Sequence, residues 1–399
     1  MKLQNLFVFA LIFLILILFN ACGEQKSKWQ GTAEEVDGVM IVTNPIEPFY
    51  GELTFELEED LRIGNDEDDK YLFYRARSIA LDSDENIYVV DSGNYRIQKF
   101  DRQGKYLYTV GRKGEGPGEF SQPYGLYIDS QSFLYVREYR RLQVFNESGE
   151  FLKVIPLNVN LVDFAVDTEG NLFGNVDLQP RDNAVRAIIK LNSQGEIVRE
   201  VVKYFDFGIK IIVTANRTFT LSPNHTYTPR LCFTQIEGDI FIFGYSSEYI
   251  LNLFDKNGKI FLKIIKDELL QPISQKEKEI ILGKALKSLA RGNIKIPRKK
   301  VEEAMHFRKY RSCFEKIITD DSQRIYVQKV KSVFAEDDDY TFDVFNRDGL
   351  FLYQLSLSFS PELIQNGFLY DIFTSQDSGE VKIIRYKIKN WDQIKTRIN

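Results

Sequence analysis

A five-residue turn of the form Phe/Leu-Asp/Asn-x-x-Gly, followed by an apolar strand, recurs five times along the chain. The turns end at Gly104, Gly149, Gly195, Gly258 and Gly349, and successive glycines lie 45, 46, 63 and 91 residues apart. Asp and Asn supply side-chain-to-backbone hydrogen bonds at such turns, and Gly supplies the positive φ that a tight strand reversal needs. A repeat of roughly 40–50 residues built from short strands is typical of propeller blades.

A second shared element lies upstream of each turn: an apolar run, an acidic turn and an alternating strand that ends near an aromatic residue. The clearest copies are Asp82–Val89 and Asp129–Val136, the weaker ones are Asp167–Phe173 and Asp321–Val327, and Glu237–Phe241 fills the remaining place. Each repeat therefore predicts strand a, acidic turn, strand b, loop, strand c, glycine turn and strand d, which is a four-stranded blade.

The two ends of the chain supply strands for a sixth blade. Gly367–Thr374 and Glu380–Ile388 are strand-like near the C-terminus, and Val39–Thr43 and Glu52–Ile63 are strand-like before the first repeat. Pairing the two ends in one blade closes the ring and removes exposed edges. The sequence therefore predicts an all-β, six-bladed β-propeller over residues 37–390, with a last blade shared by N- and C-terminal strands whose division stays open.

Two intervals between glycine turns contain insertions. The first lies around Tyr204–Arg230, where Asn, Thr and Pro interrupt the strand pattern. The second, residues 266–311, changes period: Ser274 to Glu277 form a capping box, and apolar residues follow at helical spacing. Pro297 suits the first turn of another helix. A helical hairpin is therefore expected to interrupt the β-structure.

The N-terminus has the features of an export signal. The run Leu6–Phe19 is apolar throughout, which is too short for a comfortable membrane span but suits a signal-peptide core. Ala21 directly before Cys22 resembles a bacterial lipoprotein signal, in which the cysteine is lipidated and becomes the new N-terminus. Residues 1–21 are then the signal peptide and 22–36 a polar tether. An ordinary cleaved signal and a short N-terminal anchor are the alternatives.

The composition agrees with an exported β-protein. Phe and Tyr together number 52, enough for a sizeable core, and a formal net charge of −5 argues against nucleic-acid binding. Cys232 and Cys313 are expected near the starts of inner strands in neighbouring blades. Export permits a disulfide between them, and two buried free thiols are the other interpretation.

The first blade resembles a known repeat. Asp91–Asp101 with Gly104, and Val110–Phe120 with Pro123, closely resemble an NHL repeat, strongly over residues 77–125 and only by period after the second blade. With the lipoprotein start and the helical insertion, the chain resembles bacterial six-bladed β-propeller lipoproteins with NHL-like repeats. The resemblance implies fold and location, and no activity follows from it.

Related six-bladed propellers include metal-dependent lactonases and lyases, whose ligands stand where strand b ends. Here those positions hold Val90/Asp91, Arg137/Glu138, Asn175/Val176, Phe243/Gly244 and Gln328/Lys329. Two carboxylates and one amide diluted by cationic and apolar residues make a poor cage for a hard cation. His225 and His306 have no zinc-like spacing to other ligands. We therefore expect no catalytic residue, metal or cofactor, and a metal-dependent lactonase- or lyase-like enzyme is the alternative.

Basic residues are expected to gather on the propeller end that carries the d-to-a and b-to-c loops. Residues 266–311 have 13 Lys/Arg against 6 Asp/Glu, which leaves about −12 on the rest of the chain. The acidic a-to-b turns lie at the opposite end. The candidate ligand-binding residues are Arg75, Arg77, Arg112, Lys113, Arg137, Arg140 and Arg141. The other interpretation is that these are solvated loop charges.

These features predict a lipid-anchored, extracytoplasmic protein of the bacterial cell envelope. Its propeller would act as a non-enzymatic scaffold that binds an anionic ligand or an envelope protein through the basic end. A structural role in an envelope complex is a third class.

Overall fold

The structure is a computed structural model that describes residues 29–65, 67–178, 183–207, 210–214, 217–221, 226–292, 294–335 and 339–398. The chain divides into two units, Met1–Gln30 and Gly31–Asn399, and every strand and helix named below belongs to the second. The expected signal peptide over 1–21 and the lipidation site Cys22 lie outside the described residues. Within the described part of the chain, no helix is both long enough and apolar enough to cross a membrane.

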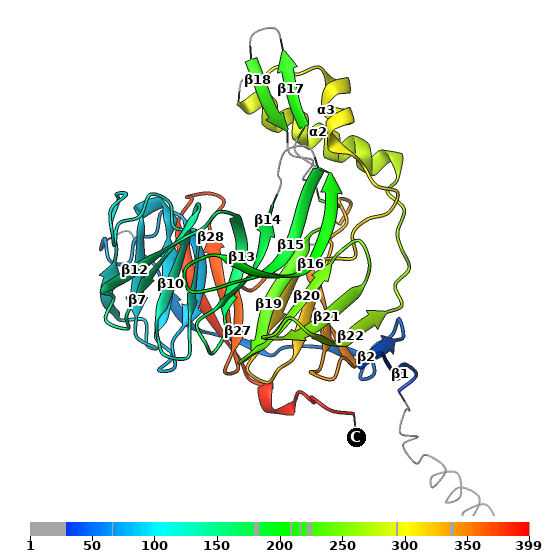
Figure 1. The fold of residues 1–399 in the computed structure, drawn as a ribbon, viewed down its shortest axis with the longest axis horizontal. Coiled ribbons are helices and arrows are strands. Elements are labelled where there is room, and N and C mark those ends of the chain that lie inside the picture. Colours follow the sequence, from blue (N-terminus) through cyan, green and yellow to red (C-terminus); the bar gives the residue numbers. More distant parts are fainter. Residues whose placement is uncertain are drawn as a thin grey trace, which may run out of the picture. The chain divides into compact units, whose positions relative to one another are not determined.

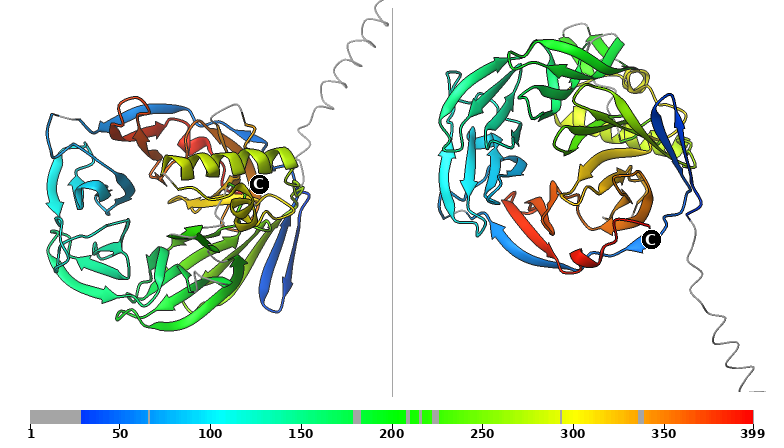
Figure 2. Two further views of the ribbon diagram at one scale, coloured as in Figure 1. Left: turned by 90° about the horizontal axis from the view of Figure 1, so that it is seen from above. Right: turned by 60° about the horizontal axis from the view of Figure 1, so that its bottom comes forward.

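Six antiparallel blades form a ring, as the sequence predicts (Figures 1 and 2). Blade 1 consists of β5 (Ala76–Leu81), β6 (Ile87–Asp91), β7 (Arg96–Phe100) and β8 (Tyr106–Val110). Blade 2 consists of β9 (Gly125–Ile128), β10 (Leu134–Glu138), β11 (Arg141–Phe145) and β12 (Phe151–Pro156). Blade 3 consists of β13 (Asn160–Val166), β14 (Leu172–Asp177), β15 (Asn183–Leu191) and β16 (Ile197–Phe207).

The remaining blades follow the same order, with the innermost strand first. Blade 4 consists of β19 (Leu231–Glu237), β20 (Ile240–Tyr245), β21 (Ile250–Asp255) and β22 (Ile260–Lys266). Blade 5 consists of β23 (Phe314–Thr319), β24 (Ile325–Lys329), β25 (Tyr340–Phe345) and β26 (Phe351–Leu357). Blade 6 consists of β27 (Leu363–Gln365), β28 (Phe368–Thr374), β29 (Val381–Ile388) and the N-terminal β4 (Leu57–Ile63).

The glycine turns close the hairpin between the two outer strands of blades 1 to 5. In blade 1 the amide of Gly104 donates to the carbonyl of Asp101 at 2.9 Å, and Asp101 Oδ1 accepts two further amides. The five turn glycines all have φ between 73° and 83°, where a side chain is strained. At Gly195 a Cβ would also lie 2.0 Å from the carbonyl oxygen of Pro156 in blade 2. The turn therefore sets both the hairpin and the close approach of neighbouring blades.

The first residue of each turn, Phe or Leu, anchors its blade in the core. Phe100, Phe145, Leu191, Phe254 and Phe345 are each at most 1% exposed. The ring of Phe254, for example, lies 5.6 Å from the ring of Phe173 in blade 3. Burial of such a side chain stabilises a fold by about 1.5–3 kcal/mol, so the first position of the repeat holds adjacent blades together.

One N-terminal strand closes the ring. β4 pairs antiparallel with β29 from Leu57 opposite Ile388 to Ile63 opposite Ile383. The closing blade therefore has three C-terminal strands and one N-terminal strand, which confirms that the two ends share it.

The earlier N-terminal strands lie elsewhere, which answers the question of strand division that the sequence leaves open. β2 (Val39–Asn44) pairs in parallel with β22, which extends blade 4, and β1 (Thr32–Val36) covers β2. β3 (Glu52–Leu53) pairs in parallel with β26 of blade 5. A blade offers the N-terminal segment only one outer edge, so the rest of this segment extends blades 4 and 5. β1 begins at Thr32, inside the segment 22–36 expected to be a tether.

Both insertions stand at the same end of the propeller, at the top of Figure 1. The first contains β17 (Lys210–Thr214) and β18 (Arg217–Leu221), which pair as a hairpin. The second contains α2 (Gln275–Arg291) and α3 (Arg298–Met305), which confirms the predicted helical pair. Ser274 and Glu277 form the expected capping box at the start of α2, and Pro297 directly precedes α3. We call this end of the propeller the insertion end.

Candidate functional site

The two insertions are joined to each other and to blade 5 by one buried tyrosine. Tyr227, at the end of the first insertion, packs in an apolar cluster with Ile281 and Leu282 of α2 and Val301 of α3. Its hydroxyl donates to Glu277 Oε1 at 2.7 Å and accepts the amide of Val333 at 3.0 Å. The segment that follows Tyr227 enters β19, the innermost strand of blade 4. The insertions are therefore connected to the inner wall of the ring.

Several predicted basic residues are already partnered at the insertion end. Arg112 forms an ion pair with Glu119 at 2.9 Å, although its side chain is 80% exposed. The ammonium of Lys113 lies 5.0 Å from the ring of Tyr95. Arg75, Arg77 and Arg140 are exposed. An exposed pair contributes little to stability, but it lowers the net positive charge that a ligand would meet.

Arg141 binds the loop between β8 and β9. It donates to the buried carboxylate of Glu138 at 2.7 Å and to the carbonyl oxygens of Glu115 and Glu119 at 2.9 and 3.2 Å. Glu138 also accepts the amides of Ser121 and Gln122. Burial alone would raise the pKa of Glu138, but Arg141 and these donors lower it below its ordinary value. Arg141 is thus a structural cation, and the prediction that it faces a ligand lacks support.

Blade 1 repeats this arrangement with Asp91. The carboxylate is fully buried, accepts the amides of Tyr74 and Arg75 at 3.1 and 3.3 Å, and pairs with Arg96 at 3.2 Å. Asp91 and Glu138 are the two carboxylates that the sequence places where a metal site would form. Both instead accept backbone amides of the segment that leads into the first strand of their own blade. In the described part of the chain, no three His, Cys, Asp or Glu residues are close enough to hold a metal ion.

Arg137 points toward blade 3. Its Nη1 donates to the carbonyl oxygen of Leu161 at 2.8 Å, and its guanidinium lies 5.3 Å from the ring of Tyr124. Burial lowers the pKa of Arg137, and the charge of Asp163 opposes that shift. Of the predicted residues, Arg137 is therefore the one whose partners lie on an inner strand of the neighbouring blade.

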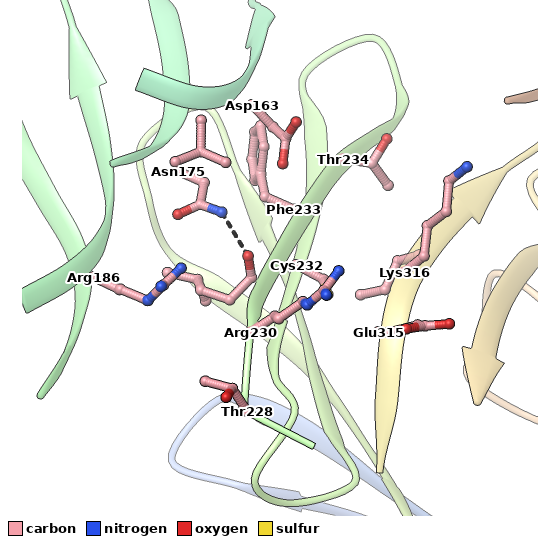
Figure 3. A pocket seen from close by; sticks show the side chains of 13 residues that line it. Asp163, Asn175, Arg186, Thr228, Arg230, Cys232, Phe233, Thr234, Glu315 and Lys316 are labelled. Atoms are coloured by element: carbon pink, nitrogen blue, oxygen red, sulfur yellow. Dashed lines mark hydrogen bonds between the residues drawn. The ribbon is translucent and has the colours of Figure 1, made fainter. Parts of the chain in front are cut away.

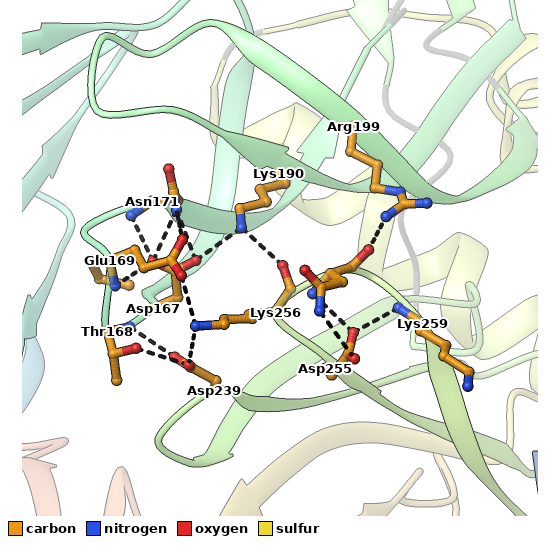
Figure 4. Close-up of polar contacts among 12 residues, drawn as sticks. Asp167, Thr168, Glu169, Asn171, Lys190, Arg199, Asp239, Asp255, Lys256 and Lys259 are labelled. Atoms are coloured by element: carbon orange, nitrogen blue, oxygen red, sulfur yellow. Dashed lines mark hydrogen bonds and ion pairs between the residues drawn. The ribbon is translucent and has the colours of Figure 1, made fainter.

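The charges at the opposite end are largely neutralised between blades 3 and 4 (Figure 4). Lys256 pairs with Glu169 at 2.7 Å and with Asp239 at 3.3 Å. Lys190 pairs with Asp167 at 3.0 Å. The expected acidic a-to-b turns are present, but here their carboxylates bind lysines of adjacent turns and strands. The charge contrast between the two ends is therefore smaller than the sequence suggests.

A cavity of about 400 Å³ opens among the inner strands of blades 3, 4 and 5 (Figure 3). We call it the inner-strand cavity. Its walls come from β13, β14, β15, β19 and β23 and from the segment before β19. The lining residues are Val162, Asp163, Asn175, Arg186, Thr228, Arg230, Leu231, Cys232, Phe233, Thr234, Glu315, Lys316 and Ile317. Thr228 and Arg230 follow Tyr227 closely, so the segment that leads out of the first insertion forms part of the cavity wall.

Four charged side chains surround the Cys232 thiol in this cavity. Burial raises the pKa of Cys232 to about 12, with the carboxylates of Asp163 and Glu315 acting in the same direction and the guanidiniums of Arg230 and Arg186 opposing them. Opposite charges from three blades therefore converge on one small volume.

The two cysteines are buried free thiols in neighbouring blades, as one of the two sequence interpretations proposes. Cys232 lies in β19 of blade 4, and Cys313 directly precedes β23 of blade 5. Burial raises the pKa of Cys313 to about 11.

Three polar groups in the inner-strand cavity have no partner within the described chain. The carboxylate of Asp163 and the guanidinium of Arg230 are exposed and make no side-chain hydrogen bond or ion pair there. Asn175 is 1% exposed, and its Nδ2 donates to the carbonyl oxygen of Leu231 at 2.5 Å. Its Oδ1 is buried without a hydrogen bond. Although Asp163 is accessible to solvent, the protein atoms around the cavity partly desolvate its carboxylate and raise its pKa, and Arg137 and Lys316 partly offset that effect.

Sequence reasoning selected Asn175 only as one of several possible metal ligands and did not select Asp163 or Arg230. Asp163 lies beside an irregularity in the pairing of β13 with β14, which alternation of apolar residues does not reveal. Arg230 lies at the end of an insertion, where no repeat gives its register. The pairing of Glu138 with Arg141 did have a signal, because two residues that flank a two-residue turn face each other.

Comparisons with known proteins agree on the architecture. The family model DUF5128, described as a 6-bladed beta-propeller, matches residues 68–235. No curated protein matches the chain. A protein of Bacteroides fragilis proposed to be exported is 12% identical over 87% of this chain and 100% of its own, with a TM-score of 0.51. A member of the DUF4221 family from Bacteroides vulgatus is 12% identical over 84% of this chain and 98% of its own, with a TM-score of 0.52.

A more distant likeness concerns an enzyme. Virginiamycin B lyase from Staphylococcus aureus is 10% identical over 84% of this chain and 99% of its own, and its TM-score of 0.41 carries no argument about activity. Identities this low describe the fold alone. The chain is a mainly β, six-bladed propeller with an N-terminal strand in its closing blade and two inserted helices.

Proposed function

We propose that this protein is a membrane-tethered, extracytoplasmic binding propeller that takes a small charged ligand in the inner-strand cavity. The observation that carries the proposal is the set of partnerless polar groups there: Asp163, Arg230 and Asn175 Oδ1. A buried polar group such as Asn175 Oδ1 is normally hydrogen-bonded, and Asp163 and Arg230 are charged groups that are open to solvent in the same cavity. Small-ligand sites combine apolar walls with a few convergent polar groups, which describes this cavity.

The basic loops of the insertion end have a secondary role in this proposal. Arg75, Arg77 and Arg140 are exposed and would raise the local concentration of anionic ligands or of an acidic envelope protein. Arg112 and Arg141 are paired with carboxylates, so they contribute less. An anionic partner that binds the insertion end thus stays part of the proposal.

The proposed location rests on the sequence. The apolar run Leu6–Phe19 and the Ala21-Cys22 pair support a lipid anchor, and a structural neighbour proposed to be exported agrees with export alone. Cys22→Ala should move the protein from the membrane fraction to the soluble fraction and abolish incorporation of labelled lipid. Retention of both lipid label and membrane association would overturn the anchor.

A metal-dependent lactonase- or lyase-like reaction is less well supported by the residues present. Asp91 and Glu138 are engaged by the backbone of their own loops and by Arg96 and Arg141. Releasing either carboxylate to a metal would leave a half-buried arginine without its carboxylate partner. Binding without chemistry therefore agrees better with this donor set.

The proposed function is tested by blocking the inner-strand cavity. The full chain, purified in detergent, is screened by thermal shift and calorimetry against anionic, zwitterionic and neutral small molecules. Thr234→Trp fills the cavity, and Thr32→Trp, on the exposed strand β1, is the matched control. At 100 times its Kd a ligand should stabilise the protein by about 2.7 kcal/mol. This stabilisation should persist in the Thr32 variant and vanish in the Thr234 variant; binding that is unaffected by Thr234→Trp would contradict the proposal.

A further inference from the structure

We infer that the two inserted helices bind an extended acidic segment of another envelope protein through a run of lysines and arginines over residues 284–300. We call these residues the basic run; they comprise the second half of α2, the connection to α3 and the first turn of α3. The inference rests on the part of the proposed function that gives the insertion end an anionic partner. It names the surface and the chemistry of that partner.

The positive charge of the second insertion is concentrated in the basic run. Residues 266–311 have 13 Lys/Arg against 6 Asp/Glu, and the basic run has seven Lys/Arg and no Asp or Glu, which leaves six of each outside it. The surplus of the whole insertion therefore lies in this run. All seven cations are exposed to solvent: Lys284, Lys287, Arg291, Lys295, Arg298, Lys299 and Lys300. A surface of one sign attracts partners of the other sign.

Most of this charge is not neutralised within the fold. Arg298 is paired with Glu279 of α2. Lysines at the opposite end of the propeller are paired in the same way, as Lys256 is with Glu169. Five cations of the basic run make no side-chain hydrogen bond, ion pair or ring contact in the described part of the chain: Lys284, Lys287, Arg291, Lys295 and Lys299. These five remain for a partner.

The start of α3 shows that its cations do not serve the helix itself. Arg298, Lys299 and Lys300 occupy its first turn, which contains no acidic residue, and Pro297 before it provides no side-chain cap. A helix N-terminus carries a partial positive charge, so cations there oppose the helix dipole, whereas Asp or Glu would stabilise it. Departures from such local rules are expected at functional sites.

α2 holds its three cations of the basic run in one row. The helix is anchored by Ile281 in the apolar cluster around Tyr227, and it lies in front of the ring in the view from the insertion end (Figure 2). Lys284, Lys287 and Arg291 follow one another at i, i+3 and i+7, so they are about 4.5 and 6 Å apart along the axis. Alternate side chains of an extended segment lie about 6.6 Å apart on one face. Alternate carboxylates of such a segment can therefore meet successive cations of α2.

The helices offer no apolar face to a lipid bilayer. Val301 and Met305 of α3 pack in the cluster with Tyr227, and no large apolar side chain among the described residues of 275–305 is exposed. A helix that binds in a membrane interface buries an apolar face in the lipid. The propeller also begins at β1, at the lower right of Figure 1, whereas both helices stand at its top. The surface attracts by charge, which suits a polar acidic segment.

The test measures the binding of a defined acidic peptide by fluorescence anisotropy. The full chain in a non-ionic detergent is titrated into a labelled peptide of alternating Glu and Ser, and a peptide of alternating Gln and Ser is the uncharged control. The acidic peptide should bind and the uncharged one should not. Raising the ionic strength from about 0.1 to 1 M shortens the Debye length from about 10 to 3 Å, so the affinity should fall steeply. Equal binding of both peptides would overturn the inference.

Two triple variants that lose the same charge locate the contact. Lys284→Gln, Lys287→Gln and Arg291→Gln together should weaken peptide binding about 3- to 100-fold, as expected for the loss of three exposed ion pairs. The matched control removes three exposed lysines of the blades whose side chains also have no partner among the described residues: Lys105→Gln, Lys153→Gln and Lys259→Gln. It should leave Kd unchanged. Equal weakening in both triple variants would show attraction by overall charge and would refute the site.

Lys299→Gln separates binding from folding. It removes a cation that opposes the dipole of α3, so hydrogen exchange in α3 should slow or stay constant while peptide binding weakens. Weaker binding together with faster exchange in α3 would show that Lys299 acts through the structure of the helix, against its assignment to the binding surface.

Two competitors test the choice of partner. Polygalacturonate and detergent micelles doped with phosphatidylglycerol are added at equal concentrations of negative charge. Neither should displace the labelled peptide as well as unlabelled peptide does. If either displaces it better, and the triple variant of α2 abolishes that advantage, an acidic protein segment is the wrong partner.

Thr234→Trp distinguishes this inference from the proposed cavity function. The variant fills the inner-strand cavity and should leave peptide binding unchanged. If the peptide binds as described and no small molecule binds in the cavity, the cavity proposal is wrong and the inference stands. If small molecules bind in the cavity and the triple variant of α2 does not alter peptide binding, the inference is wrong and the cavity proposal stands.

Discussion

The hydroxyl of Tyr227 donates a hydrogen bond to Glu277 Oε1 at 2.7 Å and so joins the first insertion to the first helix of the second. The same hydroxyl accepts the amide of Val333, in the loop between β24 and β25 of blade 5. One side chain therefore connects both insertions to the ring, next to the segment that leads into the inner-strand cavity.

Tyr227→Phe should loosen the insertions without unfolding the propeller. The change leaves the Val333 amide and the buried Glu277 carboxylate without this partner, at a cost of about 1–3 kcal/mol. Hydrogen exchange should accelerate in α2 by at least about fivefold and stay constant in blades 1 and 2. Tyr139→Phe, at a residue that is 63% exposed, is the matched control and should change neither region. Uniform acceleration over all blades would contradict a local role.

Arg141→Gln should destabilise the protein, whereas Arg140→Gln should not. Loss of Arg141 leaves the buried carboxylate of Glu138 without its cation, which costs about 2–4 kcal/mol. Arg140 is exposed beside Tyr139, so its loss should stay within about 0.5 kcal/mol. Urea unfolding of the two variants measures the difference. Equal stabilities would show that Arg141 does not hold its loop as described.

Asp371→Asn should stabilise the folded chain at pH values above about 4, and most strongly above about pH 6. Burial, together with the charge of Glu362, raises the pKa of Asp371 to about 6. An unfolded Asp titrates near pH 3.9, so between about pH 4 and 6 the folded state binds more protons and loses stability as the pH rises. The variant removes this penalty, on the order of 1 kcal/mol after solvent screening.

Urea unfolding from pH 4 to pH 8 tests that sign. The gain from Asp371→Asn should be absent near pH 4, grow toward pH 6 and then stay constant. Asp84→Asn, in an exposed turn, should show no such trend. A gain that is the same at every pH would contradict the raised pKa.

Neither Cys232 nor Cys313 should react with iodoacetamide in the folded protein at neutral pH. Burial raises the pKa of Cys232 to about 12, so its thiolate is roughly 1,000-fold scarcer than that of an ordinary thiol. Mass spectrometry should find both thiols unmodified in the native chain and alkylated in urea. Rapid native labelling of Cys232 would show that its surroundings in the cavity are more open than described.

The regular parts of the fold were predictable because each depends on a few neighbouring residues. The Asp101–Gly104 turn satisfies its own hydrogen bonds and requires a positive φ only at its glycine, so the five copies are visible in the sequence. The capping box of Ser274 and Glu277 is local in the same way. Both predictions are confirmed.

The rest depends on contacts between residues far apart in the sequence. β2 extends blade 4 because Met40 meets Leu262, a pairing that no local pattern specifies. The candidate site depends on a cavity that strands of blades 3, 4 and 5 line together. The sequence therefore predicted a ring and a basic end. It did not predict which charged side chains pair with other residues of the fold and which stay available to a ligand.

The N-terminal strands that extend blades 4 and 5 and complete blade 6 are the first to be synthesised and the last that can pair. Leu57 has to wait for Ile388, and Glu52 for Gln354, so almost the whole chain is made before these partners exist. Contacts between residues so far apart in the sequence form late, and they slow the folding of the chain. A nascent or translocating chain would meanwhile keep its leading strands unpaired, and we expect ring closure, rather than the formation of single blades, to limit the rate of maturation.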